Sequence, residues 1–262
     1  MPRPVIALTT DFGQTDSYVG AMKGVILRIC PEAVLVDISH EIRPQAVQQA
    51  AYLLSTAAPY FPLGTIHLVI VDPGVGTERR PIVVQTDRAI YVAPDNGVLS
   101  LALGQEPALQ AIHLTEPRYR LSTVSDTFHG RDIFAPAAAH LASGTKPGEM
   151  GKPVRPSELV TVPTLNPQLQ LDGRWQAEIL HVDHFGNLVT NFRIPNHGSP
   201  TAVTLPGHRI ETLSRTFADG VPGELIAYVG SSGYLEIAVR QGNAARQLDM
   251  DIGAPVQVEG IR

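Results

Sequence analysis

Short apolar runs alternate with helical patterns over roughly the first 145 residues. Buried-strand runs cover residues 5–10, 33–38 and 65–71, and the amphipathic patterns at residues 15–30 and 46–57 separate them. Strands that alternate with helices at this spacing predict an α/β domain with a largely parallel sheet flanked by helices.

The pattern continues with two short runs at residues 82–85 and 89–92, which predict a hairpin. The turn-forming residues 94–97 then lead into a short helix, and the Ala-rich residues 134–142 predict another.

A change of composition between residues 144 and 172 indicates a linker. This segment has little periodicity and contains five prolines: Pro147, Pro153, Pro156, Pro163 and Pro167. The sequence therefore predicts an α/β domain over residues 1–150, a Pro-rich linker over 151–172 and a second domain over 173–262.

The second domain has a different pattern. Its helical signal disappears, and short alternating runs at residues 177–182, 188–192, 224–229 and 234–239 are separated by turns that contain glycine. These runs predict a smaller all-β, barrel-like domain.

Composition and charge narrow the classes of partner. The 262 residues are 44% hydrophobic, and 25 acidic against 20 basic residues give a formal net charge of −5. Because no overall positive field is present, neither nucleic acid nor an anionic membrane is an expected partner.

Cysteine usage and the N-terminus point to a compartment. Cys30 is the single cysteine and cannot close an intrachain disulfide. The N-terminal apolar run stops at Asp11, too early for a signal peptide, and no run approaches the roughly 20 apolar residues of a membrane span. We expect a cytoplasmic protein.

Three carboxylates, Asp11, Asp37 and Asp72, fall at or near the ends of predicted parallel strands. Ligands of open α/β sheets collect at the carboxyl ends of the strands, so this placement favours a binding site. The alternative for each aspartate is a structural role as a cap of the next helix or turn.

Asp72 opens the segment Pro73-Gly74-Val75-Gly76, which ends in Arg79-Arg80. It is not a Walker A loop, because no Gly-Lys-Ser/Thr follows, and Arg79 stands where a dinucleotide fingerprint needs its third glycine. The glycines allow a ligand to approach the backbone closely, although a Pro-Gly turn with solvated arginines is also common.

A second polar cluster lies at residues 126–132. Its His129 is next to Gly130 in a polar loop and is well placed to meet a ligand, whereas His140 lies in an apolar helical pattern. Asp and His together can bind a metal, but the adjacent arginines would repel a divalent cation, so we expect no metal site and treat metal hydrolysis as a minor alternative.

The third cluster, at residues 183–187, contains Phe185 and Asn187. A phenylalanine can stack on a purine, and an asparagine offers a donor and an acceptor to a base edge, so this cluster could read adenine. The alternative is an Asx turn with Phe185 in the core. Residues 230–234 alone indicate only a hairpin.

Six motifs in one order give the chain a resemblance to the S-adenosyl-L-methionine (SAM) hydroxide adenosyltransferase family, the adenosyl-forming SAM hydrolases related to the SAM-dependent fluorinase and chlorinase. The motifs are Thr10-Asp11-Phe12-Gly13, Val71-Asp72-Pro73-Gly74-Val75-Gly76-Thr77-Glu78-Arg79-Arg80, Pro94-Asp95-Asn96-Gly97, Thr127-Phe128-His129-Gly130-Arg131-Asp132, Asp183-x-Phe185-Gly186-Asn187 and Gly233-Tyr234-Leu235-Glu236-Ile237-Ala238.

The resemblance implies that SAM and water give adenosine and L-methionine by in-line attack on the ribose C5′. In that family an Asp, an Arg and a His act on the water, and they match Asp72, Arg79 and His129. Arg79 can stabilise hydroxide, His129 can relay a proton and Asp72 can orient the pair. The sequence does not say which of them takes the proton. SAM is the substrate, and no cofactor is implied.

The resemblance also implies substrate contacts and a homotrimer with its sites at subunit interfaces. Asp11 is expected to bind the ribose hydroxyls and Asp183 the methionine ammonium. The remaining expected contacts are Phe185 and Asn187 to adenine, Phe217 as a wall, and Ser231, Tyr234 and Val239 in the C-terminal segment.

Departures from the halogenase branch favour hydrolysis. In the halogenases the position of Asp72 is aromatic, that of Arg79 is not arginine, that of Gly130 is a serine that helps to hold halide, and that of Gln45 is a tryptophan. A carboxylate at position 72 would repel halide. The alternatives that stay open are a SAM-dependent halogenase and a non-catalytic module that binds SAM or adenosine.

Overall fold

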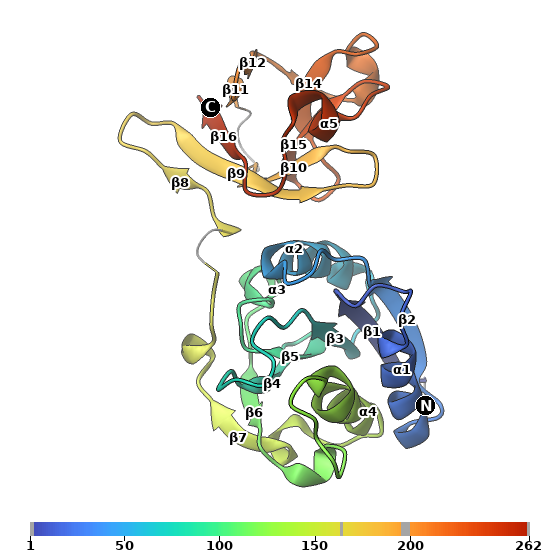
Figure 1. Ribbon diagram of the computed structural model, residues 1–262. Helices are drawn as coiled ribbons and strands as arrows, with labels where there is room; N and C mark the ends of the chain where they lie inside the picture. The colour runs from blue at the N-terminus through green and yellow to red at the C-terminus, as the bar shows by residue number, and fades with distance from the viewer. Residues whose placement is uncertain (1–2, 163–164, 195–199, 261–262) are drawn as a thin grey trace. The chain divides into compact units, whose positions relative to one another are not determined.

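The computed structural model describes residues 3–162, 165–194 and 200–260 (Figure 1). It divides into two units, Met1–Val162 and Pro163–Arg262. The first is an α/β domain and the second is built mainly of β-strands, as the sequence predicts. Over the described residues, none of the helices has both the length and the apolar character that a membrane span requires.

One seven-stranded sheet forms the centre of the first unit, in the order β2-β1-β3-β5-β4-β6-β7. β2, β1, β3 and β5 are parallel, and β4, β6 and β7 are antiparallel to their neighbours. The strands are β1 (Val5–Thr10), β2 (Val34–Ser39), β3 (Thr65–Ile70), β4 (Pro81–Gln85), β5 (Ala89–Pro94), β6 (Gln110–Leu114) and β7 (Gly151–Val154).

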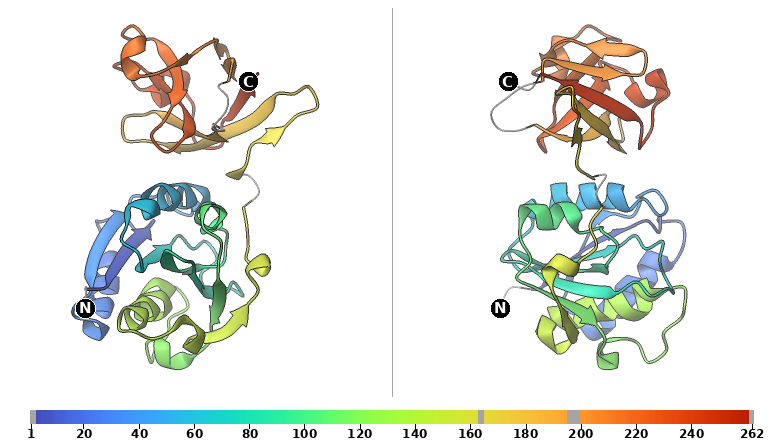
Figure 2. Two further views of the ribbon diagram at one scale, coloured as in Figure 1. Left: turned by 180° about the vertical axis from the view of Figure 1, so that it is seen from behind. Right: turned by 90° about the vertical axis from the view of Figure 1, so that its left-hand side faces the viewer.

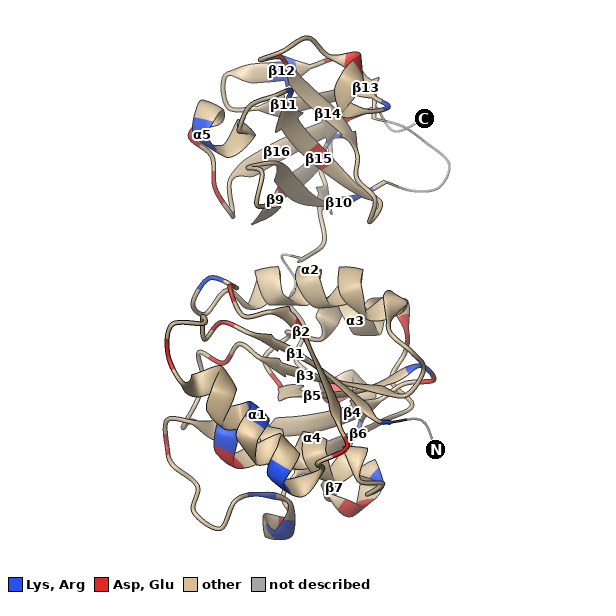
Figure 3. Ribbon diagram, turned by 90° about the vertical axis from the view of Figure 1, so that its right-hand side faces the viewer, with Lys and Arg blue, Asp and Glu red and all other residues tan. Residues whose placement is uncertain are grey.

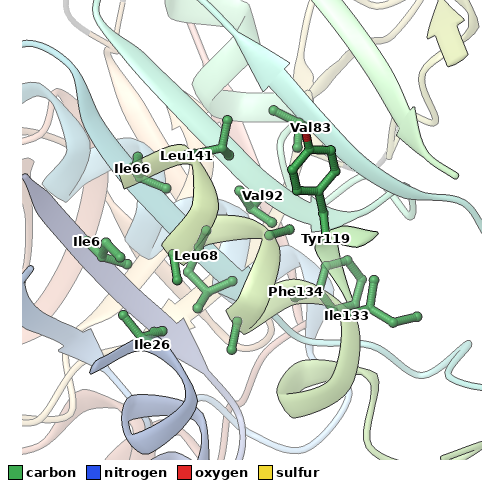
Figure 4. Close-up of a cluster of buried hydrophobic side chains, with 14 of the residues drawn as sticks. Ile6, Ile26, Ile66, Leu68, Val83, Val92, Tyr119, Ile133, Phe134 and Leu141 are labelled. Carbon is green, nitrogen blue, oxygen red and sulfur yellow. The ribbon is translucent and has the colours of Figure 1, made fainter. Parts of the chain in front are cut away.

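Helices cover both faces of this sheet (Figures 1 and 2). α1 (Tyr18–Ile29) and α4 (Ala135–Ala142) pack on one face, and α2 (Val47–Ala57) and α3 (Ser100–Gln105) on the other. Because strand residues alternate between faces, Leu68 joins the core under α1 and α4 (Figure 4), while Val69 joins the core under α2 and α3. A π-helical turn, η3 (Gly130–Phe134), leads into α4. The described residues of this unit also include 3₁₀ helices at Ala58–Tyr60, Pro117–Tyr119, Pro147–Glu149 and Pro156–Glu158, and the second unit has one at Phe217–Asp219.

The start of α1 differs from the sequence prediction. The pattern at residues 15–30 predicts a helix from about residue 15, but the helix begins at Tyr18, and its N-cap Ser17 makes no side-chain capping bond.

The segment 151–172 is more ordered than the predicted linker. β7 pairs with β6, and Val160 donates its backbone N–H to Asp95, so the first unit reaches Val162 rather than residue 150. β7 is an edge strand, where Pro153 is tolerated because it needs no N–H for a further neighbour. Of the five prolines that suggest a linker, Pro153 lies within an ordered edge strand, and Pro147 and Pro156 each begin a 3₁₀ helix.

The second unit contains a nine-stranded sheet in the order β12-β11-β16-β9-β10-β15-β14-β13, with β8 paired to β9. β12 lies against β14, so the sheet curls into a nearly closed barrel. Its strands are β8 (Gln168–Leu169), β9 (Trp175–Val182), β10 (Leu188–Arg193), β11 (Ala202–Leu205), β12 (His208–Ile210), β13 (Leu213–Ser214), β14 (Leu225–Val229), β15 (Tyr234–Val239) and β16 (Pro255–Glu259). The short helix α5 (Ala244–Leu248), capped by Asn243, was not expected from the sequence.

His67 is fully buried on β3 between the rings of Phe61 and Tyr91, at centroid distances of 5.3 and 5.2 Å. Among the described residues neither of its ring nitrogens has a hydrogen-bond partner. Burial lowers the pKa of His67 to about 4.

This pKa predicts acid sensitivity. An unfolded chain protonates its histidine near pH 6.5, whereas the folded chain keeps His67 neutral down to about pH 4, so acid favours unfolding in this window. We expect the free energy of unfolding to fall by about 3 kcal/mol from pH 6.5 to pH 4 through this group. Urea unfolding of the wild type and of His67→Phe at both pH values measures it, and an equal loss in the two proteins would contradict the assignment.

Candidate active site

Charged residues are scarce within the strands of the first unit and lie mainly on its helices and loops (Figure 3). Two aspartates follow paired strand ends. Thr10 of β1 pairs with Ile70 of β3, so Asp11 and Asp72 leave the sheet at the same edge. The register of the two parallel strands thus places both carboxylates at the end where α/β sheets bind ligands.

Asp72, Arg79 and His129 form one hydrogen-bonded chain. Arg79 Nε donates to Asp72 Oδ1 and Oδ2 at 3.0 and 2.9 Å, and Nη2 donates to Oδ2 at 2.5 Å. Nη2 also lies 2.7 Å from His129 Nδ1. The structure therefore brings together the three residues that the resemblance singles out, over a separation of 50 positions between Arg79 and His129.

This chain fixes the protonation of His129. A guanidinium has only donors, so Nδ1 must accept, and the imidazole proton lies on Nε2. Burial lowers the pKa of His129, and the charge of Arg79 lowers it further. His129 is therefore neutral near pH 7 and has an N–H at Nε2.

The ion pair at the centre is largely shielded from water. The side chains of Arg79 and Asp72 are 9% and 6% exposed, and the guanidinium lies 5.1 Å from the ring centroid of Phe134. A desolvated charge-assisted pair is stronger than the same pair in water, so its geometry is well fixed.

A second ion pair anchors the residues beside this site. Arg80 Nε donates to Asp95 Oδ2 at 2.8 Å, and Asp95 Oδ1 accepts the Val160 N–H at 2.9 Å. Asn96 Nδ2 donates to the carbonyl of Val71 at 2.8 Å. The motif at residues 94–97 thus holds the backbone next to Arg79 and Asp72. Sequence reasoning gave these residues no role, although the motif itself was visible.

A cavity of about 300 Å³ is lined by two of the three residues, Asp72 and His129, and Arg79 lies behind them. Asp11 is part of its wall, and the N–H of Gln45 donates to Asp11 Oδ2 at 2.8 Å. Gln45 has a φ of 68°, a left-handed conformation that costs a non-glycine residue energy and often marks a functional site. The lining residues are Asp11, Phe12, Tyr18, Pro44, Gln45, Ile70, Asp72, Val75, Thr127, Phe128, His129 and Gly130.

Three aromatic rings form one side of this cavity. Phe12, Tyr18 and Phe128 have centroids 5.2 to 5.9 Å apart. A Cβ at Gly130 would lie 3.2 Å from the Phe12 ring and 3.3 Å from Met22 Sδ. The packing therefore leaves little space at position 130 for the serine of the halogenases.

In the second unit, Phe185, Asn187, Phe217 and Val239 line a cavity of about 540 Å³. Asp183 Oδ1 accepts the N–H groups of Phe185 and Asn187 at 2.9 and 2.8 Å, and Oδ2 accepts Asn187 Nδ2 at 2.8 Å. The Asx turn is thus present, but Phe185 is 72% exposed rather than part of the core. Asp183 positions the Asn187 carboxamide, and both cavity aromatics stay open to a ligand.

Ser231 and Tyr234 are not among the residues that line this cavity. Ser231 is exposed in the turn between β14 and β15. Tyr234 is 3% exposed, and its ring lies under the Arg193 guanidinium at 5.7 Å. A substrate contact by either residue stays a prediction.

Comparisons with known proteins cover both units. Residues 6–151 match the model of the SAM hydroxide adenosyltransferase N-terminal domain, and residues 177–257 match that of the C-terminal domain. Proteins named (R)-S-adenosyl-L-methionine hydrolase from Salinispora arenicola and Thermus thermophilus are each 40% identical to this chain, with coverage of 97% of both chains in the first case and 98% and 99% in the second. A fluorinase from Nocardia brasiliensis is 30% identical over 98% of this chain and 97% of its own.

A crystal structure of an uncharacterized conserved protein from Thermotoga maritima superimposes with a TM-score of 0.88 at 34% identity, covering 97% of this chain and all of the other. The sequence motifs, the two-unit fold and these matches agree. The chain belongs to the SAM hydroxide adenosyltransferase family.

Proposed function

We propose that this protein is an adenosyl-forming SAM hydrolase, which converts SAM and water to adenosine and L-methionine. The observation that supports this most directly is the hydrogen-bonded chain Asp72–Arg79–His129, whose two ends, Asp72 and His129, line a cavity. Because the relatives at 40% identity are named for (R)-SAM, the proposal includes a preference for the R configuration at sulfur.

The hydrogen bonds suggest how the proton moves. The His129 lone pair already accepts from Arg79, so His129 offers water only the Nε2–H donor. Asp72 is then the acceptor of the water proton, and Arg79 stabilises the developing hydroxide. The water oxygen forms a bond to C5′ while the C5′–S bond breaks and its electron pair stays on sulfur, giving the neutral thioether of methionine.

Charge is neutralised as this reaction proceeds. Hydroxide character meets a sulfonium, and a site that excludes water favours a step in which opposite charges disappear. The low exposure of the Asp72–Arg79 pair is consistent with such a site. A module that only bound adenosine would need none of the three residues.

The substrate contacts of the proposal follow the resemblance. Asp11 binds the ribose, Phe185 and Asn187 bind adenine, and Asp183 binds the ammonium group, with Phe217, Ser231, Tyr234 and Val239 around them. Homotrimer formation, sites at the subunit interfaces and a cytoplasmic location are parts of the same proposal. Neither nucleic acid nor a membrane is a partner in it.

The proposal requires no metal or cofactor. Turnover of SAM should be the same with and without EDTA, measured by chromatography of adenosine and methionine. Added fluoride or chloride should give no 5′-halogenated nucleoside, because halide would approach the Asp72 carboxylate. Loss of turnover in EDTA, or a halogenated product, would contradict the proposal.

Replacement of Asn187 by alanine should weaken adenosine binding. The change removes the carboxamide that Asp183 orients toward the cavity of the second unit. We expect the Kd for adenosine, measured by calorimetry, to rise about ten-fold, the size of one or two lost hydrogen bonds. Unchanged affinity would mean that Asn187 does not bind adenine.

A further inference from the structure

Asp132 is a fully buried carboxylate that neither belongs to the catalytic chain nor lines its cavity. Its Oδ2 accepts the Ser125 N–H at 2.8 Å and the Ser125 hydroxyl at 2.7 Å. Arg131 Nε donates to Oδ1 at 2.6 Å, and Arg131 Nη2 donates to Oδ2 at 3.1 Å. A buried charge with this many donors fixes the groups that it contacts.

These bonds close residues 125–132 into a loop, here called the Ser125–Asp132 clamp. Phe128 N donates to Ser125 Oγ at 3.1 Å, and the Phe128 carbonyl accepts the N–H groups of Arg131 and Asp132 at 3.2 and 3.1 Å. His129 lies inside the closed loop, immediately before the π-helical turn η3. π-helical turns are rare in proteins as a whole, but those that occur are often at functional sites. Here the clamp holds the turn that directs the His129 side chain.

The clamp also contacts the loop that carries Arg79. Gly76 has a φ of 77°, and a Cβ on it would lie 2.7 Å from the carbonyl oxygen of Asp126. The two loops therefore touch backbone to backbone. A shift of the clamp would change the 2.7 Å distance between Arg79 Nη2 and His129 Nδ1.

We infer that Asp132 is a positioning residue, which acts through Ser125 to hold His129 Nδ1 against the Arg79 guanidinium. Its catalytic consequence rests on the proposed function. A misplacement of about 1 Å at a catalytic group can cost on the order of 10²-fold in rate, so the clamp is expected to affect kcat although it touches no substrate.

Two variants test the inference by kinetics. Ser125→Ala removes the hydroxyl that links Asp132 to Phe128 N. Asp132→Asn keeps one acceptor oxygen and replaces the other by an NH2 group, which then faces a donor of Ser125 or Arg131. We expect kcat to fall about ten-fold in Ser125→Ala and on the order of 10²-fold in Asp132→Asn, with KM within about two-fold. Unchanged kcat in folded protein, or a change confined to KM, would overturn the inference.

The matched control is Glu106→Gln. Glu106 is a half-buried carboxylate directly after α3. It accepts from Thr86, which precedes β5, and from Tyr91 of β5, away from the catalytic edge of the sheet. It should lower thermal stability without lowering kcat. If it lowers kcat as much as Ser125→Ala does, the clamp effect is general destabilisation.

A measurement without substrate separates this inference from the proposed function. ¹⁵N chemical shifts of His129 report which ring nitrogen carries the proton. The wild type should show the proton on Nε2, and Ser125→Ala should show a mixture of tautomers and a pKa of His129 closer to its ordinary value, since contact with Arg79 loosens. The charged groups near His129 are Arg79, Asp72, Asp132 and Arg120, and Ser125→Ala changes none of their charges. Identical shifts in both proteins would overturn the inference even if SAM is hydrolysed, whereas altered shifts in an enzyme inactive on SAM would reject only the proposed function.

Discussion

Replacing Arg79 by lysine is expected to lower kcat for SAM hydrolysis by on the order of 10³-fold. The guanidinium contacts both oxygens of Asp72 and, through Nη2, the Nδ1 of His129. A lysine ammonium is a compact charge without this planar fork, so it cannot hold both partners in the same geometry. The positive charge at position 79 is kept, but lysine no longer stabilises hydroxide in the same way. It also no longer holds His129 in the tautomer that has its proton on Nε2.

The loss is measured as kcat at saturating SAM in folded Arg79→Lys protein. Arg88→Lys is the matched control, because Arg88 donates to the carbonyl of Pro59 far from the catalytic chain and should retain wild-type kcat. An Arg79→Lys enzyme with more than about a tenth of wild-type kcat would mean that the fork geometry is not required.

Asp72→Asn should also lower kcat strongly, by about 10²- to 10⁴-fold. The change is nearly isosteric, but an amide cannot accept the proton of the attacking water, and the buried charge of Arg79 is left without its counter-ion. Adenosine binding should persist, since the proposal assigns the adenine contacts to other residues.

Asp37→Asn is the comparison for this variant. Asp37 also lies near the end of a parallel strand, within β2, but it binds Lys23 and His40 instead of Arg79. Its kcat should stay within a few-fold of the wild type. Similar losses in the two variants would mean that strand-end carboxylates act through stability, and wild-type turnover in Asp72→Asn would remove Asp72 from the mechanism.

Much of the fold could be predicted from local pattern. The run at residues 5–10 predicts β1 as observed, and the runs at 82–85 and 89–92 predict the β4–β5 hairpin, because each strand carries its apolar pattern in its own residues. β7 was missed because Pro153 and its neighbours lack a strand pattern, and only pairing with β6 makes them a strand.

The site could be predicted in part. The resemblance singled out Asp72, Arg79 and His129, but no spacing could say that one guanidinium bridges the other two, because that contact depends on two loops meeting at Gly76 and Asp126. Arg80, Asp95 and Asp132 were missed for the same reason. Their hydrogen-bond partners lie on other segments or beside a π-helical turn, and no periodicity in the sequence predicts such a turn.

Hydrolysis of separated (R)- and (S)-SAM in ¹⁸O-labelled water tests the central claim most directly. Mass spectrometry of the products follows the oxygen that attacks C5′. We predict that (R)-SAM gives adenosine with one ¹⁸O at the 5′ position together with an equal amount of unlabelled methionine, and that (S)-SAM reacts more slowly. Adenosine without the label, or no adenosine from either epimer, would contradict water activation by Asp72, Arg79 and His129.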